Sequence, residues 1–105
     1  MGAAPKFSAE RQHTRIPCFA PAVVESGGEM VAGVCENISL GGAFFRGAPR
    51  PRTPFVQMVL CIPSLGPVEV EGEVRHACAD GFGVRFTWLS PAAALGIRIF
   101  LGAFR

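Results

Sequence analysis

The sequence predicts an all-β fold, with five or six short antiparallel strands closed into a barrel and one α-helix at the C-terminus. Three observations support this prediction. The 105 residues include 13 Gly and 9 Pro, which punctuate many short strands rather than long helices. Residues 68–77 alternate apolar and polar side chains with the period of two that is typical of a half-buried strand. An apolar, helix-compatible run occupies residues 92–104.

The predicted strands follow one another with a turn or a loop between them. They cover residues 16–24, 30–38, 43–46, 55–62, 68–77 and 82–88. Residues 26–29 contain two glycines and predict the turn of a hairpin between the first two strands. Pro17 and Pro21 restrict the first strand to an edge or a bulged position, because proline lacks the N–H group that a central strand needs.

Ser90 and Pro91 predict the start of the helix. Serine can cap the free N–H groups, and proline is tolerated at the first helical position. The helix is apolar almost all round, so we expect it to be covered on more than one side. Closing the sheet into a barrel removes exposed strand edges, and the helix can then cover one open end.

Length and charge restrict the classes of function. A chain of 105 residues corresponds to one domain, which we place at residues 10–105 after a flexible tail at residues 1–9. The net charge of +2 is too balanced for a general binder of nucleic acid or membrane surfaces. The longest apolar stretch, at residues 95–104, is short and contains Arg98, and residues 1–10 lack the apolar core of a signal peptide. We therefore expect a cytoplasmic location and no membrane insertion.

The four cysteines show no metal-binding spacing. They stand at positions 18, 35, 61 and 78, without a C-x-x-C pair and without a histidine at the distance found in zinc fingers. Each lies in an apolar or strand-like run, so we interpret them as buried, reduced cysteines that act as small hydrophobic residues. A metal site and a redox switch are the alternatives.

Two groups of charged residues have a simple interpretation as solvated surface. The acidic group lies on the polar face of the strand at residues 68–77 and consists of Glu69, Glu71 and Glu73. The basic group lies in a proline-rich loop and consists of Arg46, Arg50 and Arg52. For this loop, docking of a partner protein is the alternative.

Two short motifs combine residue types that suit a guanine nucleotide. Arg11 and Arg15 form R-x-x-x-R directly before the first strand. Arginine contacts phosphate oxygens and the O6/N7 edge of guanine in a bidentate way, and it can stack on the base. The second motif, N-I-S-L-G-G at residues 37–42, follows the second strand.

The second motif supplies acceptors and space. The amide oxygen of Asn37 can accept guanine N–H groups, and Ser39 can add a hydroxyl contact. Gly41 and Gly42 permit a backbone shape and a close approach that a β-carbon would block.

In this order and strand context, the two motifs resemble those of the PilZ family, over residues 10–101. The resemblance implies a six-stranded antiparallel PilZ-like β-barrel with one C-terminal α-helix. It implies that Arg11 and Arg15 grip the phosphates and guanine of cyclic di-GMP, while Asn37, Ser39 and Gly42 hold a guanine edge. Position 37 often carries Asp in the family, and the amide can weaken the base contact by about 1 kcal/mol because it accepts fewer hydrogen bonds.

Residues 72–76 and 83–86 also resemble runs that family members carry. Arg75 is a weaker candidate for the ligand site. His76 is another, although it fits equally well as a histidine in the core.

The leading functional hypothesis is a stand-alone cyclic di-GMP receptor that transmits the level of this second messenger to an unidentified downstream protein. Ordering of the N-terminal segment around the ligand would be the switch. The alternative is a PilZ-like adaptor, related to motility or pili, that binds protein and no nucleotide, with the apolar helix in a partner or homodimer interface. A binder of single-stranded nucleic acid would need aromatic residues along a basic groove, and the Phe residues here fall mostly at core positions.

Catalysis would need a nucleophile with a base, paired carboxylates or a metal site, and no such motif stands out in the sequence. We therefore expect no enzyme, no catalytic or metal-binding residues and no cofactor apart from the ligand cyclic di-GMP. We also expect no nucleic acid polymer as a partner.

Overall fold

The computed structural model describes residues 15–103. Six strands and one helix follow one another along the chain: β1 (Ile16–Ser26), β2 (Glu29–Ile38), β3 (Gly42–Arg46), β4 (Phe55–Ile62), β5 (Gly66–Cys78), β6 (Gly81–Leu89) and α2 (Pro91–Gly102). The predicted six-stranded antiparallel barrel with one C-terminal helix is confirmed. The predicted tail at residues 1–9 and Arg11 lie outside the described residues.

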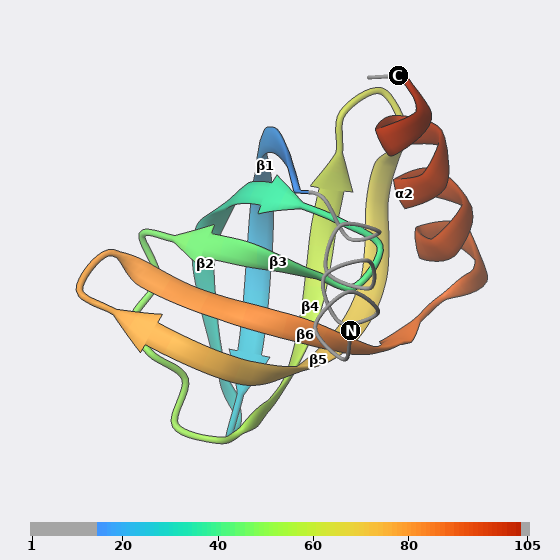
Figure 1. Ribbon diagram of the computed structural model, residues 1–105. Helices are drawn as coiled ribbons and strands as arrows, with labels where there is room; N and C mark the ends of the chain where they lie inside the picture. Colours follow the sequence, from blue (N-terminus) through green and yellow to red (C-terminus); the bar gives the residue numbers. More distant parts are fainter. Residues whose placement is uncertain (1–14, 104–105) are drawn as a thin grey trace, which may run out of the picture.

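The strands form a closed barrel in the order β1-β2-β3-β6-β5-β4, with β4 pairing back onto β1 (Figure 1). All neighbours are antiparallel. The pairing of β3 with β6, like the closure of β4 onto β1, is not suggested by sequence order, because it joins strands separated by β4 and β5. It brings the end of the β2–β3 turn next to the middle of β6, where Gly42 pairs with Arg85.

The barrel interior is filled by alternate side chains. β4 shows the cleanest alternation, with Val56, Met58, Leu60 and Ile62 buried and the residues between them exposed. Phe45 of β3 and Phe82 of β6 stack in the interior, with ring centroids 5.5 Å apart. Such apolar burial is the main source of stability for a barrel of this size.

Bulges interrupt the alternation where the barrel wall must bend. The register shifts between Pro17 and Ala20 in β1, between Cys35 and Asn37 in β2, and between Val74 and His76 in β5. A bulge turns the following side chains to the other face. The interpretation of His76 as a buried residue is therefore wrong, because the bulge at Arg75 leaves it exposed.

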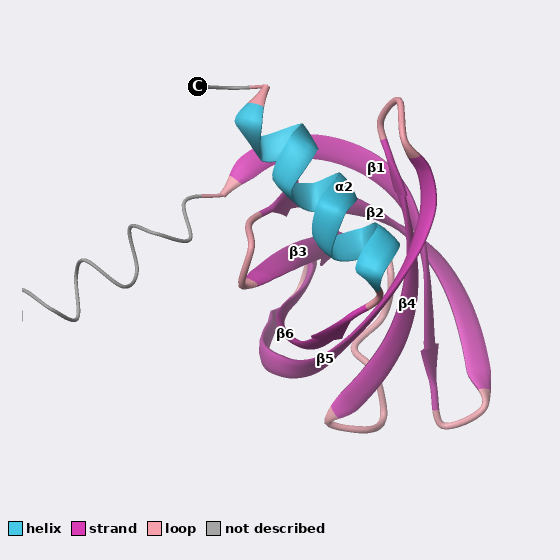
Figure 2. Cartoon of the chain, turned by 90° about the vertical axis from the view of Figure 1, so that its right-hand side faces the viewer, coloured by secondary structure: helices cyan, strands magenta, loops and turns pink. Residues whose placement is uncertain are grey.

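The helix α2 lies against the barrel beside β4, β5 and β6 (Figures 1 and 2). Ser90 caps it as predicted, accepting a hydrogen bond from the Ala93 N–H at 3.1 Å, and Pro91 is the first helical residue. The expectation that the helix is covered on more than one side is wrong. Its buried residues form a single stripe, whereas Leu95 and Ile99 point outward and are more than half exposed.

The cysteines divide into two groups. Cys35 is buried and Cys18 is partly buried, but Cys61 and Cys78 are exposed, so their predicted burial is wrong. Cys61 stands on the outward-facing side of β4, between the buried Leu60 and Ile62. Cys78 ends β5 beyond its bulge, where strand and turn are open to solvent. In the part of the chain described here, no helix has the length and apolar character needed to span a membrane.

Candidate functional site

A hollow of about 460 Å³ opens where the start of β1, the β2–β3 turn, β5 and β6 meet. Its lining residues are Arg15, Ser39, Gly41, Gly42, Arg75, Val84 and Arg85. The fold thus brings five of the predicted site residues together from three separate stretches of sequence. Arg85 was not among the predicted site residues, and it reaches the hollow because β6 pairs with β3.

Ser39 holds the β2–β3 turn together. Its hydroxyl oxygen accepts hydrogen bonds from the N–H groups of Gly41 and Gly42, both at 3.1 Å, and the hydroxyl donates to the Gly42 carbonyl oxygen at 3.3 Å. A hydroxyl has one donor and two acceptor positions, so these three bonds use its full capacity. Ser39 therefore shapes the wall of the hollow, and its own hydroxyl has no hydrogen-bonding position left for a ligand.

Asn37 lies next to this turn, at the end of β2, without lining the hollow. Within residues 15–103, its Oδ1 is the buried side-chain polar atom that has no hydrogen-bond partner. An unpaired buried acceptor costs about 1–3 kcal/mol, so it is a candidate for pairing with a donor from a bound molecule. Asn37 sits where both neighbouring pairings shift register, opposite Pro17 of β1 and Phe44 of β3.

Arg75 is the extra residue of the bulge in β5, since Val74 and His76 pair with the consecutive residues Val84 and Gly83 of β6. Bulges commonly redirect a side chain at a binding site. Here the bulge places Arg75 at the hollow beside Arg85. The sequence alternation continues through this segment, so the bulge gives no signal before the pairing is known.

Glu73 forms ion pairs with both of these arginines. Its Oε1 lies 2.9 Å from Arg85 Nη2 and 3.6 Å from Arg75 Nη1. The hydrogen bond from Arg85, with help from the charge of Arg75, lowers the pKa of Glu73 below its ordinary value. Among residues 15–103, three arginines line the hollow and no acidic residue does, so this lining favours an anion, and an anion there would compete with Glu73 for its partners.

His76 stands apart from the hollow. Its ring stacks on Phe44 across Gly83, with ring centroids 6.4 Å apart and an interplanar angle of 22°. A Cβ atom at position 83 would come within 2.5 Å of the His76 ring, so glycine leaves the space for this contact. In the basic loop, two of the three arginines form ion pairs with acidic side chains: Arg46 with Glu36, and Arg52 with Glu29.

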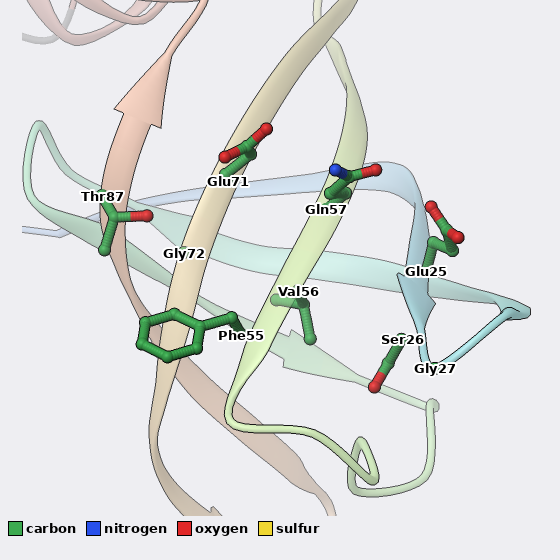
Figure 3. Close-up of a pocket in the computed structure, with 9 residues that line it drawn as sticks. All are labelled: Glu25, Ser26, Gly27, Phe55, Val56, Gln57, Glu71, Gly72 and Thr87. Atoms are coloured by element: carbon green, nitrogen blue, oxygen red, sulfur yellow. The ribbon is translucent and has the colours of Figure 1, made fainter.

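A second surface feature lies on the outer wall formed by β1, β4, β5 and β6. Two adjoining hollows of about 380 and 280 Å³ share Glu25, Gln57 and Glu71. These three residues form one row across paired strands, since Gln57 pairs with Glu25 on one side and with Glu71 on the other. Figure 3 shows the two carboxylates on either side of the amide.

Apolar side chains surround this row. We call the surface the acidic wall and define it by Val23, Glu25, Met30, Phe55, Gln57, Val59, Glu69, Glu71 and Trp88. Trp88 is 46% exposed, Phe55 60% and Met30 74%, which is unusual for side chains of this size on one face.

The comparisons with known proteins agree with the fold. The family description "PilZ domain" matches residues 9–101. The chain belongs to the PilZ family. The resemblance expected from the two motifs is thereby confirmed, whereas the search of curated proteins gave no match.

Three solved structures share the PilZ fold. The Bacillus subtilis inhibitor of motility, MotI/DgrA, aligns with a TM-score of 0.73 at 14% identity, over 90% of this chain and 50% of that one. The PilZ domain of CeSA from a cellulose-synthesizing bacterium aligns with a TM-score of 0.66 at 20% identity, over 88% of this chain and 99% of that one. PlzA of Borreliella burgdorferi, solved in complex with c-di-GMP, aligns with a TM-score of 0.63 at 13% identity, over 94% of this chain and 45% of that one. This PilZ chain therefore spans about half the length of MotI/DgrA and of PlzA.

Proposed function

We propose that this PilZ protein is a receptor for cyclic di-GMP that reports the level of the messenger to a downstream protein. The observation that carries the proposal is the hollow where Arg15, Arg75 and Arg85 converge beside the Ser39 turn. A cyclic dinucleotide offers two phosphodiester groups and guanine edges, which arginine contacts in a bidentate way. Membership of the PilZ family and the c-di-GMP complex of PlzA support the choice of ligand.

The residues have distinct roles in this proposal. Arg15 and Arg75 contact phosphate or guanine, together with Arg11, which lies outside the described residues. The unpaired Oδ1 of Asn37 is buried next to the Ser39 turn, and it accepts an N–H group of guanine once the side chain turns toward the bound messenger. Ser39 acts as a positioning residue, because its hydroxyl is used within the turn, and it presents Gly41 and Gly42 to the ligand.

Binding and release of the messenger, without chemistry, are the whole activity in this proposal. The hollow supplies cations and backbone, and its lining within the described part of the chain includes no candidate nucleophile paired with a base. No cofactor other than cyclic di-GMP is required, and we place the protein in the cytoplasm, where this messenger acts.

Calorimetric titration of the full chain with cyclic di-GMP, cyclic di-AMP and GTP tests the ligand. We expect saturable binding of cyclic di-GMP alone, lost in Arg15→Ala and kept in Arg98→Ala, a matched change on the exposed side of α2. Absence of binding at about 100 μM ligand would mean a binding free energy weaker than about −5.5 kcal/mol and would contradict the receptor proposal.

The downstream protein docks, in this proposal, on the acidic wall. Among the acidic side chains of residues 15–103, Glu29, Glu36, Glu73 and Asp80 each form an ion pair. The other three, Glu25, Glu69 and Glu71, form none, and all three lie on this wall. Unpaired carboxylates among exposed apolar side chains match a partner segment that carries Lys or Arg between large apolar residues.

The second candidate function is an adaptor that binds protein and no nucleotide. The exposed apolar side chains Leu95 and Ile99 on α2 favour it, because they offer an interface to a partner or to a second copy. The fold is also that of MotI/DgrA, which is named as an inhibitor of motility. An adaptor would keep its cellular function in Arg15→Ala, whereas a receptor would lose it.

A further inference from the structure

Cys18 of β1 and Cys35 of β2 lie close enough to react with each other. Their Sγ atoms are 3.5 Å apart, and the Cys18 thiol donates a hydrogen bond to the Cys35 carbonyl oxygen at 3.0 Å. The Cys35 thiol lies 3.4 Å from the carbonyl oxygen of Asn37. A disulfide bond is about 2.05 Å long, so the two sulfurs need to approach by about 1.5 Å.

The backbone around Cys18 can supply this movement. The register shift between Pro17 and Ala20 gives β1 one residue more than the facing part of β2. Phe19, inside this bulge, has a left-handed φ of 46° and an exposed side chain, so it carries strain without packing in the core. A bulge with one strained, exposed residue can adjust while the ladder beyond Ala20 stays intact.

The two thiols differ in burial and in pKa, so that one of them can react first with an oxidant. Cys18 is partly buried, whereas Cys35 is buried beneath it. Hydrogen bonding with Cys35, and more weakly with the backbone of Ala20 and Phe19, outweighs burial and lowers the pKa of Cys18 from 9.0 to about 7. The same pairing, with burial, raises the pKa of the Cys35 thiol, so Cys18 is the member that ionises and reacts first.

We infer that Cys18 and Cys35 form a modification site that hydrogen peroxide converts into an intramolecular disulfide. The Cys18 thiolate attacks one peroxide oxygen, the O–O bond breaks, and hydroxide leaves, so that Cys18 becomes a sulfenic acid. The Cys35 sulfur then displaces the hydroxyl group, and its thiol proton leaves with that group as water. The two thiols lose two electrons in total, and peroxide is reduced to two molecules of water.

The site adjoins the proposed messenger-binding hollow. Arg15 stands three residues before Cys18, and Asn37 stands two residues after Cys35. A disulfide would tie the start of β1 to the end of β2 and hold Arg15 near the Ser39 turn. Provided that the proposed function holds, we expect the oxidised protein to bind cyclic di-GMP about threefold more tightly, because part of the ordering is done before binding.

The test uses the full chain with Cys61→Ser and Cys78→Ser, which removes the two exposed thiols and leaves the pair. Treatment with hydrogen peroxide should lower the mass by two hydrogen atoms, and peptide mapping should place the bond between Cys18 and Cys35. A dithiol reductant should restore the original mass. The same chain carrying Cys18→Ser is the control, and wild-type protein mapped in parallel shows whether the same bond forms when Cys61 and Cys78 are present.

Each outcome decides the inference. A Cys18–Cys35 peptide that reductant removes would support it. Stable sulfinic acid at Cys18, bonds only between molecules, or an unchanged mass under peroxide that oxidises Cys61 in the wild type would overturn it. Equal affinity of the two forms would overturn the link to the hollow alone. If neither form binds the messenger, the proposed function fails while the mass still decides whether the disulfide site exists.

Discussion

Gly42 lies so close to the carbonyl oxygen of Val84 that a Cβ atom on the glycine would overlap it. The backbone of Gly42 is not left-handed, so glycine is needed here for close approach rather than for its conformational freedom. This contact joins β3 to β6 where Gly42 pairs with Arg85, and it fixes the distance between the Ser39 turn and Arg85 of β6.

Replacement of Gly42 by Ala should therefore destabilise the protein and displace the Ser39 turn from Arg85. We expect a loss of about 1–3 kcal/mol in the free energy of unfolding, because the overlapping atom belongs to the backbone and cannot rotate away. Urea denaturation measures the loss. Gly102→Ala is the matched control, since a Cβ at position 102 meets no atom within 4 Å. Equal stability of both variants would show that the β3–β6 contact can widen freely.

Ser39→Ala should weaken messenger binding beyond its effect on stability. The change leaves the Gly41 and Gly42 N–H groups without their acceptor and costs about 1–3 kcal/mol of folding free energy. Ser90→Ala removes the cap of α2 and costs about 1 kcal/mol at a residue that does not line the hollow. Titration with cyclic di-GMP under conditions where both variants are folded separates the effects: only Ser39→Ala should lose affinity. Similar losses in both would assign the role of Ser39 to stability.

In the proposed receptor, Glu73 would compete with the messenger for Arg75 and Arg85, so its removal should strengthen binding. We expect Glu73→Gln to raise the affinity for cyclic di-GMP severalfold, and Arg85→Ala to lower it about tenfold, on the scale of one charge-assisted hydrogen bond. Calorimetry at two salt concentrations measures both changes. Glu29→Gln, which removes the partner of Arg52, is the control and should leave binding unchanged. Weaker binding in Glu73→Gln would mean that Glu73 orients the arginines for the ligand.

The lowered pKa of Cys18 should be visible in its reaction with iodoacetamide. Only the thiolate reacts, so the rate should rise through a midpoint near pH 7 in the folded protein. In denaturant the hydrogen bonds from Cys35 and the backbone are lost, and the midpoint should return toward 9.0. Mass spectrometry of the Cys18 peptide gives the rate at each pH. A Cys18 midpoint that is the same in the folded and denatured chains would show that the pairing does not stabilise the thiolate.

The sequence could predict the strands because their alternation follows from local chemistry. Residues 55–62 and 68–74 alternate along the chain in the way they alternate between core and solvent, so their structure needed no knowledge of partners. The bulge at Arg75 could not be predicted, since the alternation of the sequence continues through it to His76. The exposure of the outer face of α2 also depends on which single stripe the barrel covers.

The site was predictable only in part, for a similar reason. Arg15, Ser39, Gly41 and Gly42 belong to two motifs whose residue types suit one ligand, and their meeting could be expected from a hairpin between them. Arg85 depends on the pairing of β6 with β3, which are far apart in sequence, and its partner Glu73 depends on β5 lying beyond β6. The two roles of Ser39 and Asn37 could be separated only after their hydrogen bonds were known.

The acidic wall should bind a segment in which basic and apolar residues alternate, and Trp88 can report it. Trp88 is the single Trp of the chain and lies on this wall beside Glu71, its partner across β5 and β6. We expect a synthetic peptide of alternating Lys and Leu to change the Trp88 fluorescence saturably. The double change Glu25→Gln and Glu71→Gln should weaken binding about tenfold, through loss of two desolvated charge contacts. The matched double change Glu29→Gln and Glu36→Gln alters the same net charge at carboxylates that already have partners, so it should leave binding unchanged. If both double variants weaken peptide binding equally, the peptide responds to net charge alone, and the acidic wall is not the docking surface.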